Sequence, residues 1–368
     1  MTLPTYRTHV CKTTRESKLM AVTYTSIEEP ADVLHVSEAY GGGVQTAVAQ
    51  YIENSRRYSH ELLVRVRSAH DVSRDLDVPT RRIEGSVPQF LIKAARYIRE
   101  SRPRVVHLHS SFAGLLRAFD LGDAKVVYTP HSYAFLRKDT NVPVLYAYYG
   151  IERVLSQKSQ VIAGISPHEV ATAGRLVNPR RSKVTYLPNV VRRQGVDSPK
   201  KTDCDRRVVT VGRISAQKDP GFFLDTVHAS SDPSITWTWV GDGDESMKQK
   251  LQAAGVEVTG WVPNDHVLKY IAQADLYFHP ARWEGAPITT LEAASLGTPV
   301  LVREVETMIG LGYPGAGTAP SEAALAVKRF FHDPEYNAWV TDESHHCALI
   351  RSPEVQRSAL DRLYSREN

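Results

Sequence analysis

Residues 208–221 read Val208-Val-Thr-Val-Gly-Arg-Ile-Ser-Ala-Gln-Lys-Asp-Pro-Gly221. A short apolar run is followed by a glycine that permits a tight turn, and then by a helical pattern. The segment therefore predicts a strand, a turn and a helix in succession. Repetition of this unit builds a parallel sheet with helices on both faces.

The same alternation of short apolar runs with longer helical patterns extends in both directions along the chain. Before this segment, strands are expected at 33–36, 61–64, 105–108, 126–128, 161–162 and 184–187. From it onward they are expected at 208–211, 235–240, 256–259, 276–278 and 299–302. With 368 residues, we expect an α/β protein with two doubly wound, Rossmann-like domains and a ligand in the crevice at the carboxyl ends of the strands.

Breaks in the pattern predict the domain limits. Residues 1–30 are a polar, threonine-rich leader outside the core fold, and Met20 is a second candidate start. Residues 31–190 form the N-terminal domain, 191–206 a linker containing Pro199, and 207–345 the C-terminal domain. Residues 346–368 are expected to form a helix that crosses back to the first domain.

Composition narrows the class of protein. A hydrophobic share of 42% and a charged share of 23% fit a globular protein. The net charge of +4 is too small to imply a nucleic-acid partner, but it suits a phosphorylated ligand or an anionic membrane surface. The three cysteines lack metal-ligand spacing, so we expect neither a disulfide nor zinc. The sequence contains no run of about 18 apolar residues, so we expect no helix that spans a membrane.

A second segment carries candidate binding groups. Pro287 suits a first helical turn and Gly297 a helix exit, which predicts a helix over Pro287–Leu296. Glu284 then lies in the preceding loop and Glu292 in the second turn. The unpaired N–H groups of the first turn would form an anion site on Ile288, Thr289 and Thr290. An ordinary capped helix with two surface glutamates is the alternative explanation.

Arg213 and Lys218 follow the strand at 208–211, beyond Gly212. The guanidinium fork and the ammonium group suit a diphosphate, and they would stabilise the charge that grows on a departing nucleoside diphosphate. The alternative is a solvated loop with ordinary basic residues.

Two loops of the first domain are weaker candidates. Gly41-Gly42-Gly43 follows a strand, but its spacing departs from the dinucleotide fingerprint G-x-G-x-x-G. His131 lies just beyond a strand end, where such sheets bind ligands, whereas His107 and His109 have a structural alternative.

Asp242 and Asp244 form a D-x-D pattern, which holds a metal in some enzymes. Because the pair follows a strand and precedes a helix, a turn with a helix cap is the favoured interpretation. We predict no essential metal.

Together these segments resemble the family 4 glycosyltransferases, which have the GT-B fold of two facing Rossmann-like domains and retain anomeric configuration. The resemblance covers residues 33–302 and is carried by Glu284 and Glu292 (E-x7-E), by Gly212-Arg213 with Lys218, and by residues 240–243 and 259–263. One departure is Glu284-Gly-Ala-Pro287, where members of the family commonly have Glu-Gly-Phe-Gly; Ala286 and Pro287 are the residues that differ. This change leaves the sugar-side contour, and therefore the donor, open.

The resemblance implies a role for each matched position. Glu284 would bind sugar hydroxyls and Glu292 the ribose, while Arg213, Lys218 and Gly212 would meet the diphosphate. The other positions are His131 near the reacting centre, Gly42 and Gly43 beneath the sugar, and Trp261, Val262 and Pro263 around the base. It implies no metal and no cofactor besides a nucleotide-sugar donor.

Members that build bacterial surface polysaccharides are similar in residues 35–55 and 131–139. The expected activity is hexosyl transfer from a UDP-sugar to a carbohydrate or lipid-linked acceptor, at the cytoplasmic side of the membrane. Peripheral contact with an anionic membrane is left open by a basic amphipathic helix at 89–104, for which a Rossmann helix with a solvated basic face is the alternative. Rival interpretations are an epimerase of the same fold, a noncatalytic binding subunit and, last, a dehydrogenase. The donor base, the acceptor and the oligomeric state stay open.

Overall fold

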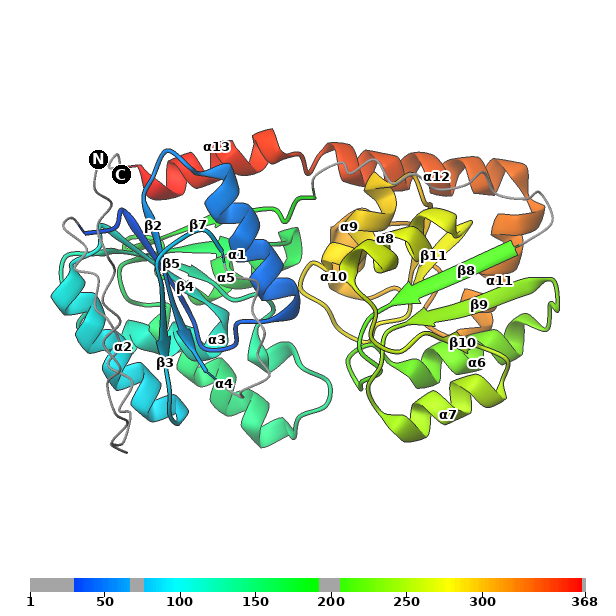
Figure 1. Ribbon diagram of the computed structural model, residues 1–368, viewed down its shortest axis with the longest axis horizontal. Coiled ribbons are helices and arrows are strands. Elements are labelled where there is room, and N and C mark those ends of the chain that lie inside the picture. Colours follow the sequence, from blue (N-terminus) through cyan, green and yellow to red (C-terminus); the bar gives the residue numbers. More distant parts are fainter. Residues whose placement is uncertain (1–29, 67–75, 192–205, 366–368) are drawn as a thin grey trace, which may run out of the picture.

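The computed structural model describes residues 30–66, 76–191 and 206–365. Two α/β domains lie side by side, and a pair of helices runs along one edge of both (Figure 1). Nearly all of the expected leader, 1–30, and of the expected linker, 191–206, lies outside the described residues.

The N-terminal domain is built on seven parallel strands in the order β3-β2-β1-β4-β5-β6-β7. Their bounds are β1 (Val33–Ser37), β2 (His60–Arg65), β3 (Thr80–Ile83), β4 (Val105–His109), β5 (Lys125–Thr129), β6 (Gln160–Gly164) and β7 (Ser182–Tyr186). The strand order reverses between β1 and β4, which is where open α/β sheets bind ligands.

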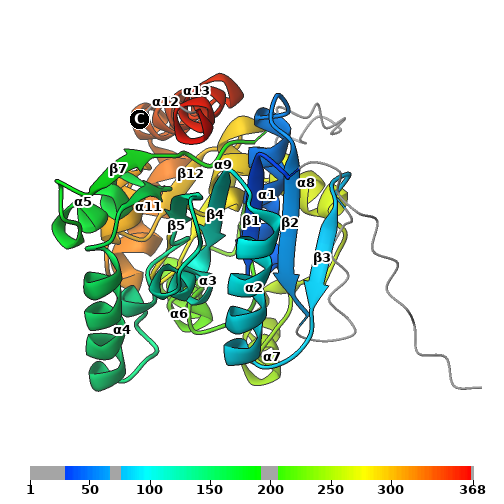
Figure 2. The same ribbon diagram turned by 90° about the vertical axis from the view of Figure 1, so that its left-hand side faces the viewer.

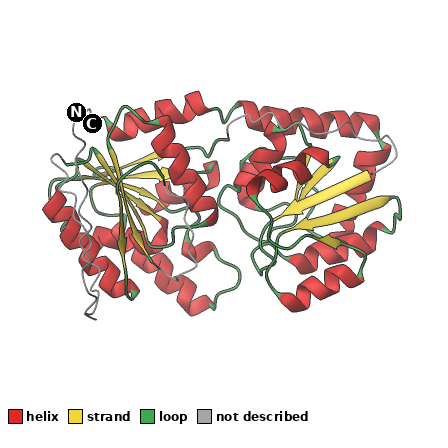
Figure 3. Cartoon of the chain, viewed as in Figure 1, coloured by secondary structure: helices red, strands yellow, loops and turns green. Residues whose placement is uncertain are grey.

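Helices cover both faces of this sheet (Figures 2 and 3). They are α1 (Gly42–Asn54), α2 (Val87–Ser101), α3 (Ser110–Gly114), α4 (Val142–Leu155) and α5 (Pro167–Leu176), with short 3₁₀ turns η1 (Leu115–Ala118) and η2 (Ala134–Leu136). Helix α2 decides between the two interpretations of its basic amphipathic pattern, in favour of a Rossmann helix with a solvated basic face. Its apolar residues, among them Phe90 and Ile98, are buried in the core, while Lys93 and Arg96 are exposed. The apolar face of α2 therefore packs on the sheet and is not available to a membrane.

The C-terminal domain has a five-stranded parallel sheet in the order β10-β9-β8-β11-β12. The strands are β8 (Arg206–Val211), β9 (Ile235–Val240), β10 (Glu257–Val258), β11 (Leu276–His279) and β12 (Val300–Val302). The helices are α6 (Pro220–Ser230), α7 (Glu245–Ala253), α8 (Asn264–Gln273), α9 (Ile288–Ser295), α10 (Glu306–Gly310) and α11 (Pro320–His332). Phe223, Trp239 and Phe278 fill the core on one face of this sheet.

The last two helices join the domains. Helix α12 (Pro334–Leu349) packs on α9, and α13 (Pro353–Tyr364) packs on α1. Leu360 and Tyr364 share an apolar cluster with Val33 of the first strand and with Ile288 of the second domain. The chain thus returns to its first domain, and the crossing lies after Leu349.

Candidate active site

A partly buried ion pair occupies the edge of the second sheet that faces the first domain. Lys218 follows β8 and Glu284 follows β11, so parallel pairing of these strands brings the two loops together. Lys218 Nζ lies 2.5 Å from Glu284 Oε1, and their side chains are 17% and 8% exposed. Glu284 Oε2 also accepts a hydrogen bond of 3.3 Å from Gln217 Nε2.

The surroundings of Glu284 keep it ionised. Burial alone would raise the pKa of its carboxyl, but the Lys218 ammonium and His279, whose Nε2 lies 3.5 Å from Oε1, outweigh burial and hold that pKa at about 2. An ionised carboxylate only accepts hydrogen bonds. Glu284 is therefore suited to bind hydroxyl groups and not to act as an acid. The sequence reasoning missed His279, whose signal was its place at a strand end.

The first turn of α9 offers the N–H groups of Ile288, Thr289 and Thr290, as expected at a helix N-terminus. The helix begins at Ile288, with Pro287 as its N-cap residue. The Tyr277 hydroxyl bonds the Thr289 hydroxyl at 2.9 Å, and the Thr290 hydroxyl donates to the Pro287 carbonyl at 2.9 Å. These bonds hold the helix start in position beside the Glu284 loop.

Glu292, one turn further along α9, lies in a cavity of about 230 Å³ between α1, α8 and α9. Thr46 and Gln50 line it from the first domain, and Asn264 and Ser295 from the second. Burial raises the pKa of the Glu292 carboxyl to about 7. A ligand that donates hydrogen bonds to this carboxyl group would stabilise its ionised form.

The turns after β8 and β9 pack against each other without side chains between them. Gly212 has φ of +153° and Gly241 has φ of +143°, and a Cβ on Gly241 would lie 2.2 Å from the Gly212 carbonyl oxygen. Isolated bridges join Ile214 to Gly243 and Gly241 to Gly260. The segment at 259–263 is thereby held beside the Gly212 turn.

Side-chain exposure differs among the residues on these turns. Arg213 is exposed beside Gly212, and Trp261 is 67% exposed, with Pro263 exposed and Val262 half-buried.

Asp242 and Asp244 serve the turn and the next helix. Asp242 accepts from the Gly243 N–H at 2.9 Å and lies 3.2 Å from Lys248 Nζ. Asp244 caps α7 by accepting from the Met247 N–H at 2.9 Å. The two carboxylates thus have the roles of a turn and a cap.

The loop after β5 carries His131 and faces the loop of Glu284, and we call the region where these loops of the two domains meet the cleft. His131 and Ser132 have φ of 51° and 80°, which is uncommon for residues other than glycine. Glu169 holds this loop, because its carboxylate accepts from the Ser132 N–H at 2.8 Å and from the Ile165 N–H at 2.7 Å. Sequence reasoning missed Glu169, although Ser166-x-x-Glu169 is a helix-start pattern.

The two domains touch where these loops meet. A Cβ placed on Gly285 would lie 3.2 Å from the Ser132 nitrogen, so the loop of Glu284 is seated against the loop of His131. Nearby, Asn189 Nδ2 donates to the Ala286 carbonyl at 2.8 Å.

The glycine run lies at the start of α1, which begins at Gly42. Gly42 has φ of +53°, and no described atom lies within 4 Å of a Cβ built on Gly41, Gly42 or Gly43. The backbone is therefore open at this point.

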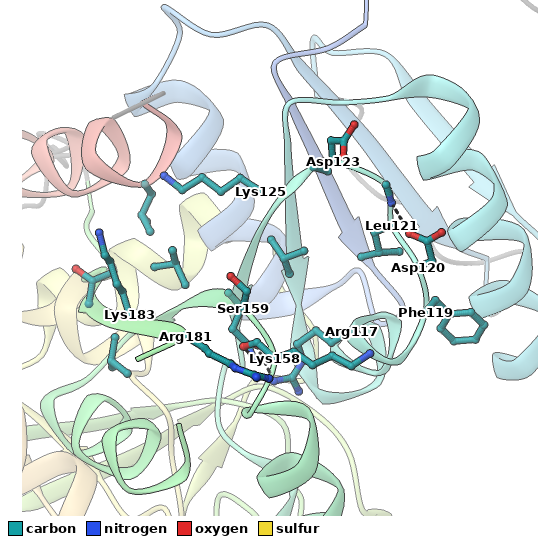
Figure 4. Close-up of a pocket in the computed structure, with 18 of the residues that line it drawn as sticks. Arg117, Phe119, Asp120, Leu121, Asp123, Lys125, Lys158, Ser159, Arg181 and Lys183 are labelled. Carbon is teal, nitrogen blue, oxygen red and sulfur yellow. Dashed lines mark hydrogen bonds between the residues drawn. The ribbon is translucent and has the colours of Figure 1, made fainter. Parts of the chain in front are cut away.

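A larger pocket, of about 1070 Å³, lies elsewhere on the first domain (Figure 4). Lys125 and Lys183 line it from the first residues of β5 and β7, and Lys158 and Arg181 from adjoining turns. These are the amino ends of the strands, so the pocket is at the opposite edge of the sheet from His131. It is suited to an anion but is not part of the cleft.

Comparison with known proteins gives two family matches. The family described as "Glycosyl transferases group 1" matches residues 205–331, and that described as "Glycosyl transferase 4-like domain" matches residues 42–190. Each match falls on one of the two sheets. In the described residues no helix has the length and apolar character needed to span a membrane.

Two bacterial relatives are similar in sequence. The chain is 27% identical over 296 residues to an uncharacterized 41.2 kDa protein in the cps region of Klebsiella pneumoniae, covering 75% of this chain and 82% of that protein. It is 26% identical over 254 residues to the UDP-Gal:α-D-GlcNAc-diphosphoundecaprenol α-1,3-galactosyltransferase of Escherichia coli, covering 58% of this chain and 61% of that enzyme.

Among solved structures, HepE of Anabaena in complex with UDP-glucose superposes with a TM-score of 0.73 at 15% identity, covering 90% of this chain and 98% of that one. The likeness shows that the arrangement of two domains is shared.

Proposed function

Because the chain belongs to the family 4 glycosyltransferases and has their GT-B fold, we propose that it transfers a hexosyl group from a UDP-sugar to a carbohydrate or lipid-linked oligosaccharide acceptor. The transfer retains the configuration at the anomeric carbon. Its place is the synthesis of a cell-surface polysaccharide.

The observation that carries this proposal is the Lys218–Glu284 pair in the cleft. A cation with three N–H groups and an ionised carboxylate lie 2.5 Å apart in one partly buried site. A nucleotide-sugar needs this combination, because its diphosphate is anionic and its sugar presents hydroxyl donors. The Ser132–Gly285 contact brings the loop of His131 to the same place.

In this proposal, different residues of the site bind different parts of the donor. Lys218, exposed Arg213 and the first N–H groups of α9 receive the diphosphate, while Glu284 accepts from hydroxyls of the sugar. Glu292 accepts from the ribose, and backbone groups of residues 261–263 hold the base. Each charge-assisted hydrogen bond to a phosphate oxygen would contribute about 1.5–3 kcal/mol.

In the chemical step, the bond between the anomeric carbon and the diphosphate oxygen breaks, and its electron pair leaves with UDP. The acceptor hydroxyl oxygen bonds to the same face of that carbon, and its proton passes to the departing phosphate oxygen. Lys218 and Arg213 stabilise the charge that grows on the diphosphate, so they lower the barrier as well as bind. No metal takes part in this scheme.

Two comparisons support uridine as the donor base. The Escherichia coli relative is named for a UDP-Gal donor, and the structural relative HepE was solved with UDP-glucose. Which sugar the enzyme accepts depends on the shape of the site at Ala286 and Pro287. The Ala286 carbonyl there already accepts a hydrogen bond from Asn189.

A lipid-linked acceptor would bring the enzyme to the membrane surface, and α4 is the element that fits this contact. Val142, Tyr146 and Val154 on α4 are 62%, 72% and 68% exposed, so this helix presents apolar and aromatic side chains to solvent. Sedimentation with vesicles of anionic lipid tests this contact. Binding should weaken in a Tyr146→Ser, Val154→Ser variant, and equal binding by both proteins would remove α4 from the proposal.

The activity is tested by incubating the purified protein with UDP-, GDP- and ADP-hexoses and a lipid-diphosphate-linked sugar. We expect the acceptor to gain one hexose from a UDP-sugar, with the donor configuration retained. An isomerised donor formed without acceptor would instead show an epimerase. Tight UDP binding with neither transfer nor donor hydrolysis would show a binding subunit.

A further inference from the structure

Three buried histidines and the partly buried His131 form a continuous chain of ring-to-ring hydrogen bonds through the first domain. His131 Nε2 lies 3.1 Å from His109 Nδ1, and His109 Nε2 lies 3.0 Å from His35 Nδ1. His35 Nε2 lies 3.1 Å from His60 Nδ1. The chain thus connects the cleft, at the end of β5, with the first residue of β2.

At the far end of the histidine chain, the direction of hydrogen-bond donation is fixed. His60 Nε2 lies 3.1 Å from the Ser55 carbonyl oxygen and 3.2 Å from the Ser55 hydroxyl, whose own proton goes to the Tyr51 carbonyl. A carbonyl oxygen only accepts, so His60 must carry its proton on Nε2. The Nδ1 of a neutral His60 is then an acceptor.

This direction propagates from ring to ring. Because a neutral imidazole has one N–H, His35 must donate from Nε2 to His60, and His109 must donate from Nε2 to His35. By the same rule His131 donates from Nε2 to His109. Burial keeps all four rings neutral, since it lowers the pKa of His35 and His109 well below the usual value and that of His60 to a lesser extent, and brings the pKa of His131 to about 3.

We propose that His60, His35 and His109 are positioning residues that lock His131 in the Nε2–H tautomer, so that its Nδ1 presents a lone pair to the cleft. Within residues 30–66, 76–191 and 206–365, no hydrogen bond reaches that Nδ1. The identity of the partner of Nδ1 rests on the proposed function: Nδ1 accepts a hydrogen bond from a hydroxyl of the bound sugar. Because the acceptor is locked, it gives that hydroxyl a defined orientation.

Two other uses of these rings fit the geometry less well. His35, His107 and His109 have nitrogens within 4.8 Å of one another and could approach a metal ion. Yet His107 bonds the Tyr364 hydroxyl at 2.7 Å and the Thr129 hydroxyl at 2.8 Å, and both nitrogens of the other two rings are bonded as well. A proton relay would need an outlet, whereas the chain ends on the Ser55 carbonyl.

The test uses the full-length protein labelled with ¹⁵N-histidine, because protonated and bare ring nitrogens have well-separated ¹⁵N shifts. Spectra are recorded without donor, so their outcome does not depend on whether a UDP-sugar is the substrate. A His131→Asn variant assigns the His131 signals. In the wild type, His131 should be protonated at Nε2 and bare at Nδ1.

Two variants of similar side-chain length separate the lock from a structural role. In His60→Gln the amide N–H can meet the Ser55 carbonyl while the amide oxygen accepts from His35, so the direction is kept. In His60→Met only the weakly accepting thioether sulfur is left for His35, and no donor is left for the Ser55 carbonyl. We expect His131 to become a mixture of tautomers only in His60→Met, with kcat/KM for donor about threefold to tenfold lower than in His60→Gln, the effect of one hydrogen bond.

Several results would overturn the inference. One is a wild-type His131 protonated at Nδ1, which decides the matter even if His60→Met fails to fold. Another is a folded His60→Met protein with an unchanged His131 tautomer. The third is a stoichiometric metal on His35, His107 and His109 of the purified protein, found by elemental analysis.

Discussion

Glu292 should make donor binding depend on pH. Burial raises the pKa of its carboxyl to about 7 in the free protein, and ribose hydroxyls would donate hydrogen bonds to the ionised form. Binding then lowers this pKa and releases a proton. The ionised fraction rises from about one tenth at pH 6 to about nine tenths at pH 8, so the affinity for a UDP-sugar should rise about tenfold over that window.

Isothermal titration calorimetry with a UDP-sugar measures this effect. The ligand suits the test because its diphosphate is esterified at both ends and does not titrate in the window. The control is Glu292→Gln, which cannot ionise and should bind with nearly the same affinity at pH 6 and pH 8. Since burial also raises the pKa of Glu169 to about 7, a slope that persists in the Glu292→Gln protein would belong to Glu169.

A wild-type affinity that is constant or falls between pH 6 and pH 8 would contradict this role of Glu292. A flat profile would mean that Glu292 does not contact the donor. A falling profile would mean that the protonated carboxyl donates to the ligand instead.

Three further perturbations test other parts of the site. Gly241→Ala should lower the free energy of unfolding by at least about 2 kcal/mol, since its Cβ would lie 2.2 Å from the Gly212 carbonyl oxygen at a φ of +143°. Gly174→Ala, at an exposed position of α5 with open space around it, should instead raise the free energy of unfolding by about 0.5–1 kcal/mol, because Ala favours a helix over Gly. Equal melting temperatures of the two variants would contradict this. Glu284→Gln should lower kcat/KM about 10- to 100-fold in transfer assays, the value of a charge-assisted hydrogen bond, while an unchanged rate would remove Glu284 from the site. A metal chelator should leave turnover unchanged because the Asp242 carboxylate is bonded to Lys248 and Gly243; a strict metal requirement would reopen the D-x-D interpretation.

Most strands could be predicted because a parallel sheet covered on both faces leaves nearly continuous apolar runs. The exception is β3, Thr80-Arg-Arg-Ile83, an edge strand with two arginines, whose pairing with β2 no local pattern reveals. Helix α2 shows a related limit. Its pattern correctly predicts an amphipathic helix, but periodicity does not tell whether the apolar face meets a sheet or a membrane.

The site, like the fold, has parts that could be predicted from the sequence and parts that could not. Motif spacing singled out Lys218 and Glu284, yet their contact depends on the pairing of β8 with β11, which the spacing does not contain. The supports of the site were missed for the same reason. His279, Glu169 and the chain from His131 to His60 act across strands that are distant in sequence, so only the folded sheet brings them together.

Hexose transfer from a UDP-sugar is the activity that we assign to the cleft of Lys218 and Glu284. It is tested most directly by comparing product formation by the wild type, Lys218→Ala and Lys248→Ala with a labelled UDP-hexose and a lipid-linked acceptor. We predict that Lys218→Ala loses about 100-fold or more in turnover, as when one group that stabilises developing charge is removed. Lys248→Ala, whose partner is Asp242, should keep wild-type turnover. Equal product formation by folded Lys218→Ala and wild type would contradict the account.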